Sequence, residues 1–433
     1  GIEPDITKET AIGKNQFEED TIINLKYVKV KDNYLFSTNL LVGGDPVNPK
    51  TGELSDLAVP IKVAKLVAQA QEIRQQYPQL ANQAIALTYT NLKDIVIALI
   101  AFDGWCSELY LCPPEVLPAN EKINHWPMKN FAPEHIKSAA KATPQIAHST
   151  LWYIATSGTT GEPKWYSHSF ESLSAGVKYS DNLQLLSWGL MYQPYRFAGL
   201  QVVLQALLSG ANLVDVSELT PLNQLQKLSQ SKVNAISATP SLWRQLLMTG
   251  QITQLSLKYI TLGGEIADQG ILGQLKQLFV KAHIRHIYAS TEAGVGLVVS
   301  DGLSGFPSKW LNDQTRKVQL KVSEQQHLLV KPPFTLSHQL AQQTDAEGFL
   351  DTQDKVQVQA DRVLFLGRAT GAINVGGNKV YPEKVEQVLL QSSDIVQTKV
   401  YPKKSTIMGE LVVADVIIKP EVDAKNVKLS LLT

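Results

Sequence analysis

The chain has 433 residues, of which 40 are lysine or arginine and 40 are aspartate or glutamate, so its formal net charge is zero. Hydrophobic residues make up 44% of the chain and charged residues 18%, a composition that supplies a sizeable core and excludes a disordered protein. Without a surplus of positive charge, the chain as a whole lacks the electrostatic basis for nucleic-acid binding, although a local basic patch stays compatible with this balance.

The cysteines and the apolar runs restrict the class of protein further. Cys106 and Cys112 are the only cysteines, too few for a disulfide-stapled secreted fold and without the spacing of a zinc site. The longest apolar runs, such as 95–102, are much shorter than the ~20 residues that span a bilayer. The first twenty residues carry six acidic side chains and no signal-peptide pattern. We therefore expect a soluble, cytoplasmic protein that does not insert into membranes.

Strand and helix patterns alternate along the first part of the chain. The spacing predicts a helix over 60–82, a strand over 84–89, a helix over 92–102 and a strand over 107–111. Because parallel strands need a crossover connection between them, this order predicts a parallel sheet with helices on its faces.

The same alternation returns beyond residue 213. It predicts strands over 233–237, 259–262 and 284–288, with helices over 241–248 and 271–282. From about 305 to 366 the pattern changes to short strands with turn signals, which predicts an antiparallel or barrel-like segment. These strands are predicted over 319–322, 327–330, 356–359 and 363–366.

A last compact group of elements follows Gly367 and Arg368. A helix is predicted over 382–390 and strands over 397–401 and 411–418. The predicted fold is α/β: a large N-terminal domain of doubly wound mixed or parallel sheets with a small β-barrel-like segment, then a small α+β C-terminal domain. We place the large domain at 1–367 and the small, mobile domain at 368–433, and we expect this small domain to be incomplete.

A glycine-rich loop follows the strand predicted over 151–155. It comprises Thr156, Ser157, Gly158, Thr159, Thr160, Gly161, Glu162, Pro163 and Lys164. Glycines let the backbone turn its amides inward, hydroxyls add donors, and a lysine supplies a point charge, which together suit phosphate oxygens. The spacing is not that of the Walker loop. On its own, the segment fits a solvated surface turn equally well.

Five segments in a fixed order resemble the motifs of the adenylate-forming enzymes, which include acyl- and aryl-CoA ligases, adenylation domains of peptide synthetases, and firefly luciferase. The segments are Thr156–Lys164; Gly263-Gly264-Glu265; Tyr288-Ala289-Ser290-Thr291-Glu292; Thr352-Gln353-Asp354; and Gly367-Arg368 leading into residues 376–386. The style of these motifs is closest to that of the acyl- and aryl-CoA ligases.

The resemblance implies a role for each matched residue in binding ATP and Mg²⁺. Lys164 and the loop 156–161 would hold the β- and γ-phosphates, and Tyr288 would stack on adenine. Thr291 would bind the α-phosphate, and Glu292 would hold Mg²⁺, which prefers oxygen ligands. Asp354 would accept both ribose hydroxyls, and Arg368 would donate to the ribose. The nucleotide-binding set is completed by Gly263, Gly264, Glu265, Ala289 and Ser290.

Alternatives remain open for several of these residues. Tyr288 is also compatible with a core aromatic residue, Glu292 with a helix N-terminal carboxylate, and Arg368 with a surface ion pair. His168 lies where many relatives carry a histidine, and the sequence does not decide whether it has a role.

The sequence departs from the family pattern at several points. Ala289 and Gln353 replace motif glycines, and Thr370 stands at the hinge position where an aspartate or lysine is usual. The family's adenylation lysine, which lies in a Gly-Lys context near the end of the C-terminal domain, has no counterpart after Arg368, because Lys419 and Lys428 do not match it. We therefore expect that the natural protein continues beyond Thr433.

Substrate specificity is expected between Tyr192 and Gly294. The stretch 193–199 contains no aspartate for an α-amine, which argues against an amino-acid substrate, and Arg196 stands where acyl- and aryl-CoA ligases carry a histidine. Arg196 either meets a second carboxylate or a phenolate of the substrate, or pairs with an acidic neighbour. The expected pocket walls for an aryl or acyl group are Phe197, Gly199, Leu200, Gly263 and Gly264.

The resemblance implies an ATP-dependent ligase that converts a carboxylic acid to an acyl-adenylate with release of pyrophosphate, and then to a CoA thioester. An acyl-AMP ligase that loads the phosphopantetheine of an acyl carrier protein is the alternative within enzymes. A nucleotide-binding homologue without catalytic activity is the alternative of another class.

Overall fold

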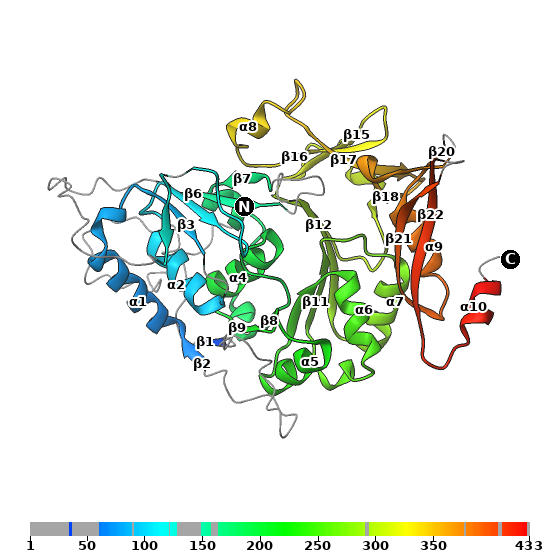
Figure 1. Ribbon diagram of the computed structural model, residues 1–433, viewed down its shortest axis with the longest axis horizontal. Helices are drawn as coiled ribbons and strands as arrows, with labels where there is room; N and C mark the ends of the chain where they lie inside the picture. The colour runs from blue at the N-terminus through cyan, green and yellow to red at the C-terminus, as the bar shows by residue number, and fades with distance from the viewer. Residues whose placement is uncertain are drawn as a thin grey trace. The chain divides into compact units, whose positions relative to one another are not determined.

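The computed structural model describes residues 34–36, 60–88, 91–120, 122–127, 149–156, 163–290, 294–375, 378–405 and 409–430 (Figure 1). The chain divides into two compact units: the first consists of residues 1–237 and 254–257, and the second of residues 238–253 and 258–433. The boundary predicted near residue 368 lies inside the second unit, and a separate small domain over 368–433 stays a prediction.

The first unit contains a five-stranded mixed sheet in the order β5-β3-β4-β6-β7. Its strands are β3 (Ala84–Leu87), β4 (Glu108–Leu111), β5 (Asn124–Trp126), β6 (Leu151–Ala155) and β7 (Trp165–His168). All pairs are parallel except β6 with β7, which is antiparallel. This arrangement confirms the predicted parallel sheet.

Helices α1 (Val63–Gln76) and α2 (Leu92–Phe102) pack on each other beside this sheet. Asn91 caps α2 by accepting a hydrogen bond of 2.9 Å from the backbone N–H of Asp94, and α2 has the predicted bounds. The helix predicted over 60–82 was too long. Residues Pro60–Lys62 form strand β2, and the helix stops before Pro78, because the residue that precedes a proline is disfavoured in helical geometry.

A second group of strands in the first unit follows the order β10-β8-β9-β1-β2. These strands are β1 (Tyr34–Phe36), β2 (Pro60–Lys62), β8 (Ser187–Leu190), β9 (Asn212–Asp215) and β10 (Ala235–Ala238). The pairs are parallel except β1 with β2. The helices of this part are α3 (Phe170–Ser174), α4 (Phe197–Ser209) and α5 (Pro221–Gln230), and α4 packs against β8 and β9.

The second unit begins with an α/β part. Strands β11 (Tyr259–Gly263) and β12 (His283–Ser290) are parallel, and β13 (Gly294–Val299) runs antiparallel to β12. Helices α6 (Pro240–Met248) and α7 (Gln269–Leu278) pack beside β11 and β12. Thr239 caps α6 and Asp268 caps α7, each by accepting a hydrogen bond from a backbone N–H of the first turn.

A five-stranded antiparallel sheet follows in the order β14-β18-β17-β16-β15. Its strands are β14 (Phe306–Pro307), β15 (Gln319–Val322), β16 (His327–Lys331), β17 (Leu350–Val358) and β18 (Arg362–Arg368), with helix α8 (His338–Ala341) between β16 and β17. A buried cluster that includes Phe306, Leu328 and Val363 forms its core. The predicted antiparallel segment is confirmed, and its closure into a barrel stays a prediction.

The C-terminal elements form a four-stranded sheet in the order β20-β19-β22-β21. Its strands are β19 (Ile373–Val375), β20 (Asn378–Val380), β21 (Ile395–Ser405) and β22 (Gly409–Ile418). Helix α9 (Pro382–Leu389) packs on β21, and α10 (Ala424–Ser430) ends the described chain. Short 3₁₀ turns cover Pro78–Leu80, Asp181–Leu185, Ile252–Gln254, Ser308–Trp310 and Ala369–Gly371.

The expectations about the cysteines and about membrane-spanning segments can be compared with the described residues. Both cysteines are free and buried. No helix among the described ranges is long and apolar enough to cross a membrane.

Candidate functional site

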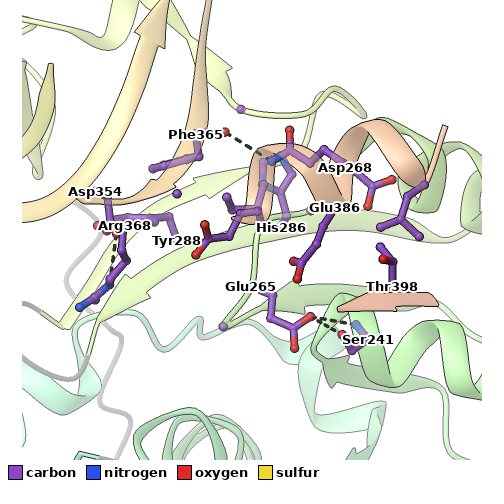
Figure 2. Close-up of a pocket in the computed structure, with 18 of the residues that line it drawn as sticks. Ser241, Glu265, Asp268, His286, Tyr288, Asp354, Phe365, Arg368, Glu386 and Thr398 are labelled. Carbon is purple, nitrogen blue, oxygen red and sulfur yellow. Dashed lines mark hydrogen bonds and ion pairs between the residues drawn. The ribbon is translucent and has the colours of Figure 1, made fainter. Parts of the chain in front are cut away.

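Asp354 lies between two of the other predicted nucleotide-binding residues in the second unit. The hydroxyl of Tyr288 donates a hydrogen bond to Oδ2 of Asp354, and Nε of Arg368 lies 3.3 Å from Oδ1 (Figure 2). The register of the β17–β18 pair explains the second contact, since Asp354 and Arg368 face each other directly across the two antiparallel strands. The structure therefore brings together three residues that lie in three separate sequence motifs.

The electrostatics of this group keep Tyr288 protonated. Burial of the ring, the negative charge of Asp354 and the hydrogen bond to Asp354 raise the pKa of Tyr288 well above its usual value. The tyrosine is therefore a fixed donor. The side chain of Asp354 is only 13% exposed, whereas that of Arg368 is 53% exposed, so the guanidinium reaches the carboxylate from the solvent side.

The ring of Tyr288 stacks on that of Phe365, with 4.8 Å between the centroids and 17° between the planes. Phe365 lies on β18, three residues before Arg368, so the same hairpin supplies both the aromatic and the charged neighbour of Tyr288. Stacking of Tyr288 on adenine stays a prediction.

The Gly263-Gly264-Glu265 segment begins with the last residue of β11, and Glu265 contacts the start of α6. Gly264 adopts a φ of +79°, a left-handed conformation that glycine adopts without strain. Glu265 accepts hydrogen bonds from the backbone N–H of Ser241 at 3.0 Å and from its hydroxyl at 2.8 Å (Figure 2). A carboxylate at this position also complements the positive end of the α6 dipole.

A cavity of about 490 Å³ in the second unit joins these groups. Gly264, Glu265, Tyr288, Ala289, Asp354 and Arg368 line it, so six residues of the predicted nucleotide-binding set share one cavity. The volume lies within the usual range for small-molecule sites.

Several residues that line the cavity were not predicted as site residues. They include Arg244, Asp268, His286, Phe365, Glu383, Glu386 and Thr398. His286 precedes Tyr288 by two positions on β12. Because side chains alternate between the two faces of a strand, the sequence could have placed His286 on the same face as Tyr288. Glu383 and Glu386 belong to the last matched motif, but the sequence does not show that α9 turns them toward the cavity.

His286 is buried, and its Nε2 lies 2.9 Å from the carbonyl oxygen of Leu303. Burial lowers the pKa of His286, with a smaller lowering from Arg362, against opposing contributions from the Leu303 carbonyl and Asp301. The cavity therefore has a neutral histidine in its wall near neutral pH.

The two ends of the glycine-rich loop lie in the first unit. The backbone N–H of Thr156 donates to the carbonyl oxygen of Lys164 at 2.9 Å, and β6 pairs with β7 on either side of the loop. Ser157, Gly158, Thr159, Thr160 and Gly161 lie outside the described residues, as do Thr291 and Glu292. The phosphate contacts and the Mg²⁺ ligand therefore stay predictions.

Arg196 contacts the strand that leads into this loop. Its Nη1 donates a hydrogen bond of 3.1 Å to the carbonyl oxygen of Ala155, the last residue of β6. No ion pair between Arg196 and an acidic side chain occurs within the described residues. Both predicted roles of Arg196, contact with the substrate and pairing with an acidic neighbour, stay predictions.

The other predicted pocket walls of the first unit are buried at the start of α4. Phe197 is 7% exposed, and its ring lies 5.7 Å from that of His168, centroid to centroid. Leu200 is fully buried. A β-carbon at Gly199 would overlap the backbone carbonyl of Gln193, so Gly199 allows the 193–196 turn to approach α4 closely.

A family model described as "AMP-binding enzyme" matches residues 103–332, more than half of the chain. A putative acyl-CoA ligase of Bacillus subtilis is 24% identical over 303 residues, which cover 64% of this chain and 59% of that protein. A 2-succinylbenzoate–CoA ligase of Bacillus cytotoxicus is 24% identical over 332 residues, 70% of this chain and 66% of that protein. The matches thus cover less than two thirds of the length of these relatives.

Solved structures share the mixed α/β fold. An o-succinylbenzoate–CoA synthetase from Bacillus subtilis, in complex with its acyl-adenylate intermediate, superposes with a TM-score of 0.62 at 17% identity, over 85% of this chain and 86% of that one. An anthranilate–CoA ligase in complex with anthranoyl-AMP gives a TM-score of 0.67 at 15% identity, over 86% and 85% of the two chains. With a family model that matches more than half of its residues, the chain belongs to the family of AMP-binding enzymes.

Proposed function

We propose that this protein is an ATP-dependent acid–thiol ligase that forms an acyl-adenylate and then a CoA thioester. The observation that supports this most directly is the placement of Asp354 between Tyr288 and Arg368 in the wall of the cavity. An ionised carboxylate only accepts hydrogen bonds, and its two oxygens match the two hydroxyls of a ribose. Arg368, half exposed beside it, supplies donors to the same sugar.

The proposed reaction has two steps in which atoms and charges balance. A carboxylate oxygen of the acid attacks the α-phosphorus of ATP, the bond to the β-phosphate bridging oxygen breaks, and pyrophosphate leaves. The thiol then loses its proton to the solvent, its sulfur attacks the acyl carbonyl, the bond to the phosphate oxygen breaks, and AMP leaves. Chemistry of this kind depends mainly on positioning and on neutralising charge.

The residues of this chain would divide that task. Lys164 and the hydroxyls and amides of residues 156–161 would hold the β- and γ-phosphates, and Thr291 the α-phosphate. Glu292 would hold Mg²⁺, which supplies charge neutralisation to the phosphates when bound. No group of three or more His, Cys, Asp or Glu side chains suited to a metal occurs in the described ranges, to which Glu292 does not belong.

The substrate is proposed to be an aryl or acyl carboxylic acid. Several relatives are named as 2-succinylbenzoate–CoA or 4-chlorobenzoate–CoA ligases, which act on aromatic acids. At the start of α4, the buried Phe197 and Leu200 supply apolar surface, and Arg196 supplies the one charge in this turn. A second carboxylate on the acid would bind Arg196 and would replace the Ala155 carbonyl as its hydrogen-bond acceptor.

The decisive experiment is pyrophosphate release from ATP and Mg²⁺ with a panel of benzoates, cinnamates, succinylbenzoate, fatty acids and amino acids. Release with one class of acid, followed by thioester formation with CoA, is the expected result. Transfer to a holo-carrier protein instead of CoA would favour the acyl-AMP ligase. ATP binding without release across the panel would contradict the enzymatic proposal and favour a non-catalytic homologue.

A further inference from the structure

The N-terminus of α4 contacts both strands that border the glycine-rich loop. Arg196 is the N-cap residue of α4, and its Nη1 donates a hydrogen bond of 3.1 Å to the carbonyl oxygen of Ala155, the last residue of β6. Phe197 is the first residue of α4, and its ring lies 5.7 Å from that of His168, the last residue of β7, centroid to centroid. One end of a single helix therefore contacts the strand that enters the loop and the strand that leaves it.

The same face of α4 holds the chain that follows β7. Nε2 of Gln201 donates to the carbonyl oxygen of Leu173 in α3 at 2.8 Å. Gln205 makes two hydrogen bonds of 2.9 Å with the backbone of Lys178, accepting from its N–H and donating to its carbonyl oxygen. Because Phe197, Gln201 and Gln205 are spaced by four residues, they lie on one face of the helix. Three successive turns of α4 thus contact β7 and the segment after it.

The pair of strands held in this way carries two of the predicted phosphate-binding residues. The backbone N–H of Thr156 donates to the carbonyl oxygen of Lys164 at 2.9 Å, and Ala155 faces Trp165 across the antiparallel pair. Thr156 directly follows the residue that Arg196 contacts. The side chain of Lys164 is exposed, so its position relative to a bound phosphate depends on the backbone that carries it. A backbone that is fixed before the ligand arrives lowers the entropy lost on binding.

We propose that Arg196 and Phe197 are positioning residues that fix the paired strands β6 and β7 and thereby hold Thr156 and Lys164 in place for the phosphates of ATP. This inference rests on the proposed function, in which these two residues bind the β- and γ-phosphates. It requires no contact of Arg196 or Phe197 with the phosphates, and it gives Arg196 a role that does not depend on which acid the protein activates.

The first test needs no nucleotide and measures amide hydrogen exchange of the peptide that covers residues 151–156. Arg196→Met removes the donor to Ala155, and Phe197→Leu removes the ring without changing the charge. Each should speed up exchange of the Thr156 amide by about fivefold or more, because that amide joins the two strands next to the loop. Lys178→Met is the control: it removes an exposed positive charge of the same unit, and its backbone bonds to Gln205 do not involve the side chain.

The second test compares the affinities for ATP and AMP in the presence of Mg²⁺ by titration calorimetry. AMP lacks the β- and γ-phosphates, and the wild-type protein should prefer ATP. Arg196→Met and Phe197→Leu should each weaken ATP binding by about fivefold and AMP binding by less than about twofold. Lys178→Met should leave the preference for ATP unchanged. Because Phe197→Leu keeps the charge, its effect separates positioning from direct attraction between Arg196 and the phosphates.

Circular dichroism checks that each variant is folded, and either variant decides the question if the other is not. Unchanged exchange of the Thr156 amide in both variants would overturn the proposal, and equal weakening of ATP and AMP would indicate a general structural role instead. A wild-type protein that prefers ATP and keeps this preference in both variants would refute only the role of Arg196 and Phe197. A wild-type protein that binds ATP and AMP equally would refute the phosphate contacts of Thr156 and Lys164, a part of the proposed function, and this inference with them.

Discussion

Asp354 is the residue through which Tyr288 and Arg368 meet, so its charge should matter more for nucleotide binding than any neighbouring carboxylate. Asp354→Asn keeps the size of the side chain but removes its charge and turns one of its two oxygens into an amide donor, so the side chain can no longer accept from both the Tyr288 hydroxyl and the Arg368 guanidinium. We expect ATP binding to weaken by about tenfold or more. Titration calorimetry with ATP measures this.

Asp361→Asn is the matched control for that change, since Asp361 is exposed in the turn of the same β17–β18 hairpin. It should leave the dissociation constant of ATP unchanged. If Asp361→Asn and Asp354→Asn weakened binding equally, overall charge and not the cavity carboxylate would be responsible.

His286 should make stability depend on pH in a defined direction. Its pKa is lowered below the ordinary value of 6.5 in the folded state, mainly by burial. As the pH falls below 6.5, the unfolded chain takes up a proton that the folded protein resists, so the free energy of unfolding decreases in that window. Above 6.5 the histidine is neutral in both states, and its contribution is constant.

His286→Gln should therefore flatten the fall in thermal midpoint on the acid side, because glutamine can donate to the Leu303 carbonyl without titrating. Thermal unfolding of both proteins from about pH 5 to 8 measures the difference. His283→Gln, which removes an exposed histidine from the same strand, is the control. A wild-type slope that survives in His286→Gln would contradict the prediction.

At the level of elements, the first turn of α4 depends on a close backbone approach. Gly199→Ala would place a β-carbon on the carbonyl of Gln193, so the 193–196 turn must move, and we expect a loss of about 1–3 kcal/mol of stability. Gly273→Ala is the matched substitution in helix α7, where no atom lies within 4 Å of the new carbon. It should stabilise by about 0.5–1 kcal/mol. Denaturant unfolding of the two variants should give opposite signs; a neutral Gly199→Ala would refute the close approach.

The bounds of the helices and strands show which parts of the fold could be predicted from the sequence. Periodicity located α2 and β15 with their exact bounds, because a continuous apolar helix and a short alternating strand are both unambiguous. The strand predicted over 356–359 is the end of β17, which begins at Leu350. The first half of β17 contains the polar sequence Asp-Thr-Gln-Asp, which has a low strand propensity. It forms a strand because it pairs with β16 and β18.

The sequence predicted six of the residues that line the cavity, but it did not predict the contacts between them. The motif resemblance identified Asp354 and Arg368, but only the strand register shows that they face each other. Glu383 illustrates the limit further: its sequence context predicts a helix N-terminus, whereas its contact with Gly367 depends on how α9 packs on β18. Tertiary contacts of this kind have no local signature in a single sequence.

For the whole molecule, the division into two units predicts unfolding in more than one step. Five of the seven tryptophans belong to the first unit, so tryptophan fluorescence reports mainly on that unit, whereas circular dichroism reports on both. The five are Trp105, Trp126, Trp152, Trp165 and Trp188. We expect the two transitions in denaturant not to coincide, since coincidence of probes is the mark of two-state unfolding.

AMP should then separate the two transitions further, because the proposed nucleotide-binding residues Tyr288, Asp354 and Arg368 all belong to the second unit. A ligand at about 100 times its dissociation constant stabilises the state that binds it by about 2.7 kcal/mol. This gain should appear as a shift of the circular dichroism transition that exceeds the shift of the fluorescence transition. Adenine alone, which lacks the ribose, is the control and should shift neither by a comparable amount. A single transition that moves as a whole with AMP would show that the two units unfold together.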